Sequence, residues 1–143
     1  MGCKGLFVLT GSQQFNLLSE ITQSLAGRVA LFETWAIGEL LKARYNRGLE
    51  SNLYFWRDRS GNEVDVLIEA GDRLAPIEIK AGQTISNDFF RGLERWQALA
   101  KGVSGKTALI YGGDKGQTRL GHKVVPWAEI GSFTSQLATD EAI

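Results

Sequence analysis

The chain of 143 residues has one cysteine, one histidine and no net charge at neutral pH. The single Cys3 excludes an internal disulfide and a cysteine-rich zinc site, and it favours a reducing cytoplasm as the location. No run approaches the roughly 18 apolar residues of a membrane span, so we expect no membrane-embedded segment. The lack of excess basic charge argues against a dedicated nucleic-acid binder, although it is compatible with a local basic patch.

The composition is that of an ordinary globular protein. Hydrophobic residues make up 43% and charged residues 22% of the chain, whose length suffices for a core of its own. The first residues contain no small-residue cleavage site, so we expect no signal peptide. His122 has no histidine or cysteine nearby in the sequence, which favours a core or solvent role over a metal site, and no serine has a triad-type partner.

Apolar periodicity predicts a mixed α/β fold. From Val29 onward the expected elements are a helix at 29–45, strands at 53–58, 63–70 and 73–81, a helix from about Asn87, and strands at 106–113 and 123–130. Short turns join the first three strands, which favours antiparallel pairing between neighbours. The order α-β-β-β-α-β predicts one mixed sheet flanked by helices, with a frayed tail from Thr134.

Three charged residues interrupt the apolar pattern of the second and third expected strands, in the stretch "GNEVDVLIEAGDRLAPIEIKAGQ". Because side chains alternate along a strand, Glu78 and Lys80 share one face, and Asp65 shares a face with Leu67, opposite Val64. If the two strands pair, the three charges can meet at one end of the sheet. Buried carboxylates without compensation are costly, and a divalent cation such as Mg²⁺ removes that cost.

An ordinary ion pair explains the same residues without chemistry. In that interpretation Asp65 and Lys80 pair across the strands, and Glu78 faces solvent on the wet side of a half-exposed antiparallel sheet. The pattern by itself leaves both interpretations open.

A wider set of residues resembles the PD-(D/E)XK nuclease superfamily. The pattern comprises Phe32-Glu33 on the upstream helix, Asp65 on one strand and Glu78-Ile79-Lys80 on the next, with Val64 in place of the proline. The resemblance implies a DNA phosphodiesterase with Mg²⁺ or Mn²⁺ as cofactor. Asp65 and Glu78 would hold the metal, Glu33 would contribute through water or a second metal, and Lys80 would position the attacking hydroxide.

The longer stretch from about Ala30 to Ile130, with "YGGD" and "VPWAEI" near its end, resembles the C-terminal domain of a prokaryotic family of AAA-type ATP-binding proteins. That domain is catalogued as domain of unknown function 4143. The resemblance implies a restriction-endonuclease-like domain at 29–143. It also supports an alternative function, a non-catalytic module of an ATPase that binds a partner or DNA.

The stretch "LFVLTGSQQFNLLSEITQSLAGRV" resembles a piece of the ATPase core of the same family, with a sensor-like Thr-Gly-Ser and an arginine, Arg28, near the phosphates. We therefore expect residues 1–28 to be a remnant of that core, a strand followed by a helix that ends at Gly27. A P-loop and a Walker B acid are missing. "AKGVSGKT" has Ala100 where the P-loop needs glycine and follows a helix, so it predicts a helix-to-strand loop and no ATP binding. The apolar front strand has lost its sheet, which predicts self-association or docking onto the remaining sheet.

The remaining candidates are surface groups. Phosphate contact and simple solvation are both open for six arginines, Arg44, Arg47, Arg57, Arg59, Arg91 and Arg95. Glu39 is interpreted as a surface charge rather than a further site carboxylate. The four tryptophans, Trp35, Trp56, Trp96 and Trp127, are predicted to pack in the core and at sheet edges, with base stacking as the alternative.

Overall fold

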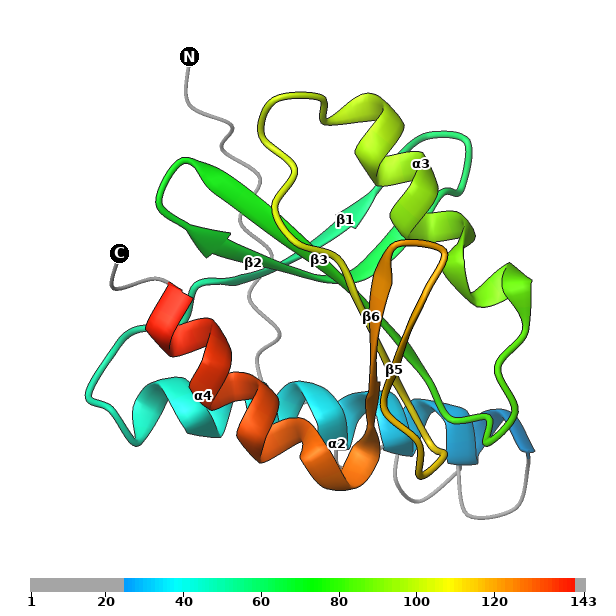
Figure 1. The fold of residues 1–143 in the computed structure, drawn as a ribbon, viewed down its shortest axis with the longest axis horizontal. Helices are drawn as coiled ribbons and strands as arrows, with labels where there is room; N and C mark the ends of the chain where they lie inside the picture. The colour runs from blue at the N-terminus through cyan, green and yellow to red at the C-terminus, as the bar shows by residue number, and fades with distance from the viewer. Residues whose placement is uncertain (1–24, 141–143) are drawn as a thin grey trace.

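The structure is a computed structural model, which describes residues 25–140 of the chain and the side chains of 30–137. The predicted helices and strands occur in the predicted order within this range, although the last strand ends at Pro126 rather than at residue 130 (Figure 1). An additional strand lies between the last two predicted ones, and an additional helix follows them. The elements are α2 (Leu25–Tyr45), β1 (Leu53–Arg57), β2 (Glu63–Ala70), β3 (Arg73–Lys80), η1 (Asn87–Phe90), α3 (Arg91–Leu99), β4 (Ala108–Tyr111), β5 (Gln117–Arg119), β6 (His122–Pro126), η2 (Trp127–Glu129) and α4 (Ile130–Asp140).

The strands form one mixed sheet in the order β1-β2-β3-β4-β6-β5, so the predicted fold class is confirmed. β1, β2 and β3 are antiparallel neighbours, as their short turns favour. β3, β4 and β6 are parallel to one another, and α3 makes the crossover from β3 to β4. The parallel strands end together, so the segments that follow β3, β4 and β6 meet at one edge of the sheet.

Helices cover both faces of the sheet. α2 and α4 lie together on one face, and α3 lies on the other (Figure 1). The core under α2 and α4 includes Ala36 and Leu40 from α2, Ile77 and Ile79 from β3, and Phe133 from α4, all buried. In the part of the chain that the structure describes, no helix has the length and apolar character needed to cross a membrane.

α2 begins earlier than predicted. It starts at Leu25 rather than Val29 and passes through Gly27, which was expected to end a preceding helix. Glycine costs about 1 kcal/mol in a helix interior, a penalty that a long helix packed along one face can absorb. The expected front strand and most of the front helix lie outside the described residues, as does the proposed self-association through that strand.

The C-terminal part holds two elements that the sequence did not predict. β5 is a short edge strand joined to β6 through Leu120 and Gly121, whose φ angles are 52° and 82°. The tail from Thr134 is not frayed, because α4 continues to Asp140. Ile130 and Phe133 anchor this helix in the core beside α2.

Candidate active site

The strand that carries Asp65 contains a bulge at that residue. β1 pairs Tyr54 with Leu67 and Trp56 with Val64, so two residues of β2, Asp65 being the first, face a single residue of β1. An extra residue bends a strand and changes the direction of its side chains, and such bulges often lie beside active sites.

Because of the bulge, the predicted alternation of side chains along β2 is wrong between Val64 and Leu67. Val64 and Leu67 both pack under α3 with Trp96, whereas Val66 and Ile68 face the core under α2. Strict alternation had put Val64 on the face opposite Leu67. Asp65 therefore lies at the point where β2 changes the face that it presents.

Asp65, Glu78 and Lys80 converge, as expected if the strands pair. Lys80 Nζ lies 2.6 Å from Glu78 Oε1 and 3.5 Å from Asp65 Oδ2. Asp65 Oδ2 also accepts a hydrogen bond of 2.7 Å from the backbone N–H of Ile79. The carboxylate of Asp65 thus joins β2 to β3 just beyond the last paired residues, Val66 and Ile77.

Glu78 does not face solvent. Its side chain is only 8% exposed, and Oε2 is buried with no hydrogen-bond partner. The ion-pair interpretation required an exposed Glu78 and an Asp65–Lys80 pair alone, so that interpretation is wrong in this form. A buried carboxylate oxygen without a partner is costly when it is charged, which favours the protonated form of Glu78.

Gly92 lets α3 cover this carboxylate. A Cβ atom at Gly92 would lie 2.7 Å from the backbone oxygen of Glu63 and 2.9 Å from Oε2 of Glu78. Both distances are shorter than any normal contact, so a side chain would push the helix away. The sequence analysis did not identify Gly92, because only the docked position of α3 makes the missing side chain matter.

The charged groups of this cluster shift one another's pKa values. Burial and then the negative charge of Asp65 raise the pKa of Glu78 to about 7, although Lys80 acts in the opposite direction. Burial by itself would lower the pKa of Lys80, but the charges of Asp65 and Glu78 outweigh it and raise the pKa. Near neutral pH the cluster therefore pairs a firmly charged lysine with a carboxyl group close to its midpoint.

Glu33 approaches the cluster from α2 without joining it. Its side chain is half-buried, and burial, followed by the charge of Asp65, raises its pKa. Lys80 lowers the same pKa, so Glu33 lies within electrostatic range of both residues. No hydrogen bond links Glu33 to Asp65 or Lys80 among the bonds identified for these side chains. From this position Glu33 can contact a group bound at Asp65 and Lys80 through a water molecule more readily than directly.

Two features of the site fit a divalent cation. Asp65 and Glu78 already share one cation, the ammonium group of Lys80, and the two carboxylates carry more negative charge than this one group offsets. Over residues 25–140, however, no three aspartate, glutamate, histidine or cysteine side chains gather as metal ligands. The fit is thus to a pair of carboxylates, which is enough for Mg²⁺ when water or phosphate oxygens complete the shell.

Four of the six candidate arginines lie on elements next to the carboxylates, namely β1, its turn to β2, and α3. Arg57 is 3.9 Å from Glu63, and Arg91, beside Gly92, pairs with Asp88 at 2.9 Å. Arg95 is near Asp58, whose pKa it helps to lower after the larger effect of hydrogen bonds from Asn62. Arg59 is exposed in the turn between β1 and β2.

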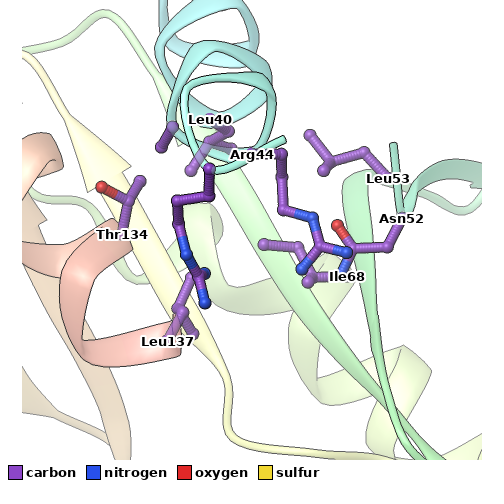
Figure 2. A pocket seen from close by; sticks show the side chains of 9 residues that line it. Leu40, Arg44, Asn52, Leu53, Ile68, Thr134 and Leu137 are labelled. Carbon is purple, nitrogen blue, oxygen red and sulfur yellow. The ribbon is translucent and has the colours of Figure 1, made fainter. Parts of the chain in front are cut away.

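Arg44 and Arg47 lie elsewhere. At ~1.5 Å per residue, Arg44 is roughly 16 Å farther along α2 than Glu33. Both arginines line a cavity of about 20 Å³, shown in Figure 2 between α2, the start of β1 and α4. This volume holds about one water molecule. The structure therefore does not bring these two arginines to the carboxylates.

The other candidates behave as structural residues. His122 is buried, stacks on Phe90 and shares a hydrogen bond of 2.6 Å with Thr107, and burial lowers its pKa. Glu39 pairs with Lys42 at 2.6 Å on the surface of α2, as expected of a surface charge. The stretch 100–107 is a loop between α3 and β4, as predicted.

The tryptophans divide into two pairs. Trp56 and Trp96 pack against each other with ring centroids 5.2 Å apart, which confirms their predicted role in packing. Trp35 and Trp127 also pack against each other, but they are 39% and 49% exposed, so they are not core residues. The periodicity of one segment cannot predict this exposure. Trp35 lies in α2 and Trp127 in the segment after β6, and the two segments meet only in the folded chain.

The geometry can be set beside the known families. A comparison with curated proteins finds no match to the chain. Residues 28–130, which include the whole carboxylate cluster, match the family described as "Domain of unknown function (DUF4143)". Since this match covers more than half of the chain, the protein belongs to the DUF4143 family.

Proposed function

We propose that the domain hydrolyses phosphodiester bonds of DNA with the help of a divalent cation. The observation that carries this proposal is the convergence of Asp65 and Glu78 on one cationic group, with Glu33 within electrostatic range of both Asp65 and Lys80. A simple ion pair uses one carboxylate, whereas a divalent cation can offset the charge of two.

The residues have distinct roles in this proposal. Asp65 and Glu78 would hold Mg²⁺ or Mn²⁺, which when bound supplies Lewis-acid stabilisation of charge on the phosphate oxygens. Lys80 would hold the attacking water and offset negative charge as it forms on the phosphate. Glu33, with its raised pKa, would accept a hydrogen bond or a proton from that water. Arg57, Arg59, Arg91 and Arg95 would contact the flanking phosphates.

The proposal extends to the origin of the domain. The resemblance of the chain to AAA-type ATP-binding proteins supports descent from a C-terminal domain of that group, with a nuclease-like site of the PD-(D/E)XK type. We further propose that it acts in the cytoplasm and does not bind ATP. If the site is not catalytic, the same fold would serve as an accessory module that binds a partner or DNA, with Lys80 as the permanent partner of the two acids.

A cleavage assay tests the proposal. Supercoiled, linear and branched DNA are incubated with the full chain and Mg²⁺ or Mn²⁺, beside the variants Asp65→Ala and Lys80→Ala. We expect cleavage by the wild type, and a loss of about 10²–10⁴-fold in each variant if the residues act in catalysis. Glu39→Ala, on the exposed surface of α2, is the matched control and should cleave normally. Equal cleavage by wild type and Asp65→Ala, or none by either, would contradict the nuclease and favour the accessory module.

A further inference from the structure

An open hollow of about 530 Å³ lies beside the carboxylate site. We call it the aromatic hollow, and its lining residues are Phe32, Trp35, Ala81, Gln83, Gly112 and Trp127. The rings of Phe32 and Trp35 are 5.8 Å apart, and those of Trp35 and Trp127 are 6.1 Å apart and meet edge to face. Three aromatic side chains from two distant segments therefore form one surface.

This surface remains exposed to solvent. Trp35 and Trp127 keep 39% and 49% of their surface exposed, although large aromatic side chains bury most of their area in a folded core. Exposed aromatic groups that gather at one place usually mark a binding site.

The aromatic hollow and the candidate active site are built from neighbouring residues of the same elements. Phe32 precedes Glu33 in α2, and Ala81 follows Lys80 at the end of β3. The backbone N–H of Gly112 donates to the carbonyl oxygen of Lys80 at 3.0 Å, so the wall of the hollow is fixed to the strand that carries the lysine. The hollow therefore lies beside the end of the strand that carries Lys80.

The lining favours a flat, uncharged and partly polar group. None of the six lining residues carries a charge, and Gln83 supplies an amide that can donate and accept hydrogen bonds. A nucleobase has this chemistry, because its two faces stack on aromatic rings and its edge is polar. In a duplex those faces are already covered by neighbouring bases. Only an unpaired base presents a free face to Trp35 or Trp127.

We propose that the aromatic hollow stacks an unpaired nucleobase, and that this contact directs the site to single-stranded DNA. The inference rests on the proposed phosphodiesterase function, because it places the base next to a backbone phosphate at Lys80. Stacking accepts every base, so we expect a preference for single strands and little preference for sequence.

Binding without cleavage tests the inference. Fluorescence anisotropy is measured with the full chain in EDTA, using a labelled single strand of about 15 nucleotides and a duplex of the same sequence. We expect Trp35→Ala and Trp127→Ala to weaken single-strand binding by about five- to hundredfold, and Trp→Phe at either position to restore most of it. Duplex binding should not change. Tyr45→Ala is the matched control, an exposed aromatic roughly 15 Å farther along α2 than Trp35.

A second probe does not depend on the folding of variants. A strand that lacks its bases but keeps its phosphates should bind the wild type about as weakly as the intact strand binds Trp35→Ala. Equal affinity for intact and abasic strands would overturn the inference, as would equal loss of single-strand and duplex binding in the tryptophan variants. Loss of self-association in those variants with unchanged strand binding would also overturn it and indicate a protein partner.

The two proposals fail in different ways. Tryptophan-dependent binding of single strands without metal-dependent cleavage would overturn the nuclease and leave the stacking site. Cleavage that depends on Asp65 but not on Trp35 or Trp127 would overturn the stacking site and leave the nuclease.

Discussion

Lys80 is the side chain on which the protonation of the whole cluster depends. It sits between two carboxylates whose side chains are 8% and 15% exposed, and one positive charge cannot neutralise both. Burial, and then the negative charge of Asp65, raise the pKa of Glu78 to about 7. Replacing one of these three residues should therefore change how stability varies with pH.

The first prediction concerns Glu78→Gln. The pKa of Glu78 is about 7 in the folded chain and near 4.5 when unfolded, so the native state binds the proton more tightly. The stability from this proton is complete below the unfolded pKa and is lost as pH rises through the folded pKa. We expect the free energy of unfolding of the wild type to fall by about 3 kcal/mol relative to the variant between pH ~5 and pH ~8.

Urea unfolding across that pH range measures the difference. His122, whose lowered pKa gives the opposite trend, is present in both proteins and cancels in the comparison. Glu39→Gln, at an exposed ion pair, should run parallel to the wild type. If Glu78→Gln also runs parallel, Glu78 is ionised throughout and the proposed cluster is wrong.

The second prediction concerns Lys80→Met. Loss of the ammonium group leaves Asp65 and Glu78 without a partner, so we expect a loss of about 3 kcal/mol near pH 8. The loss should be smaller near pH 5, where Glu78 is protonated. Millimolar Mg²⁺ or Mn²⁺ should restore part of the stability, because it binds only the folded chain.

Thermal unfolding with and without the metal ion tests this rescue. Lys42→Met removes an exposed lysine from α2 and should show neither the loss nor the rescue. A Lys80→Met protein that the metal does not stabilise would argue against a cation at Asp65 and Glu78.

At the scale of single elements, Gly92 determines how closely α3 can approach the sheet. Gly92 approaches the carboxylate of Glu78 and the backbone of Glu63, and no other residue fits this distance. The helix thereby excludes water from one oxygen of Glu78, which contributes to the raised pKa.

The third prediction follows from this contact. Gly92→Ala should destabilise the chain by about 1–3 kcal/mol, because the new methyl group meets a backbone oxygen that cannot move freely. Gly38→Ala in α2 is the matched control, since nothing lies within 4 Å of its Cβ position. That change should stabilise the helix by up to about 1 kcal/mol. Denaturant unfolding measures the free energy of unfolding of both variants. An unchanged value for Gly92→Ala would show that the contact at Gly92 does not fix the position of α3.

Much of the fold was predictable because its signals are local. Short turns and apolar runs indicated β1, β2, β3 and β4, and the Glu-x-Lys spacing placed Glu78 and Lys80 on one face. β5 was missed because Gln117–Arg119 has no apolar pattern and its turn uses Leu120 at positive φ instead of asparagine. α4 was missed because Gly131 and several hydroxyl residues have weak helix propensity, which packing against α2 overrides.

The site was predictable only where it depends on spacing along one strand. The bulge at Asp65 arises from pairing with β1, and the cover over Glu78 arises from the docking of α3. The aromatic hollow joins Trp35 to Trp127 across the sheet edge. No periodic pattern in one segment carries such information about another.

At the scale of the whole molecule, the charge is balanced but unevenly distributed. The chain has no net charge, yet Arg57, Arg59, Arg91 and Arg95 lie on β1, its turn to β2, and α3, whereas Arg44 and Arg47 line a small cavity toward the C-terminal end of α2. Binding to nucleic acid must therefore depend on the first group alone.

The fourth prediction uses this division. If four arginines contact phosphates of a single strand, the logarithm of the binding constant should fall with the logarithm of salt with a slope of about −3. Arg57→Gln and Arg91→Gln should each make the slope shallower by about 0.7. Arg44→Gln and Arg47→Gln are the controls and should leave it unchanged. Equal effects at all six arginines, measured by anisotropy over a salt series, would contradict a localised contact surface.

The two-residue turn between β2 and β3 has a consequence for how the chain folds. Asp65, Glu78 and Lys80 all lie on the hairpin that this turn closes, and short loops cost little entropy to close. The parallel pairing of β3 with β4 needs a crossover of more than 20 residues and should form later. During synthesis the three charged residues therefore leave the ribosome together and can pair early. α3 then docks over a hairpin whose charges are already arranged, so the site precedes the core that buries it.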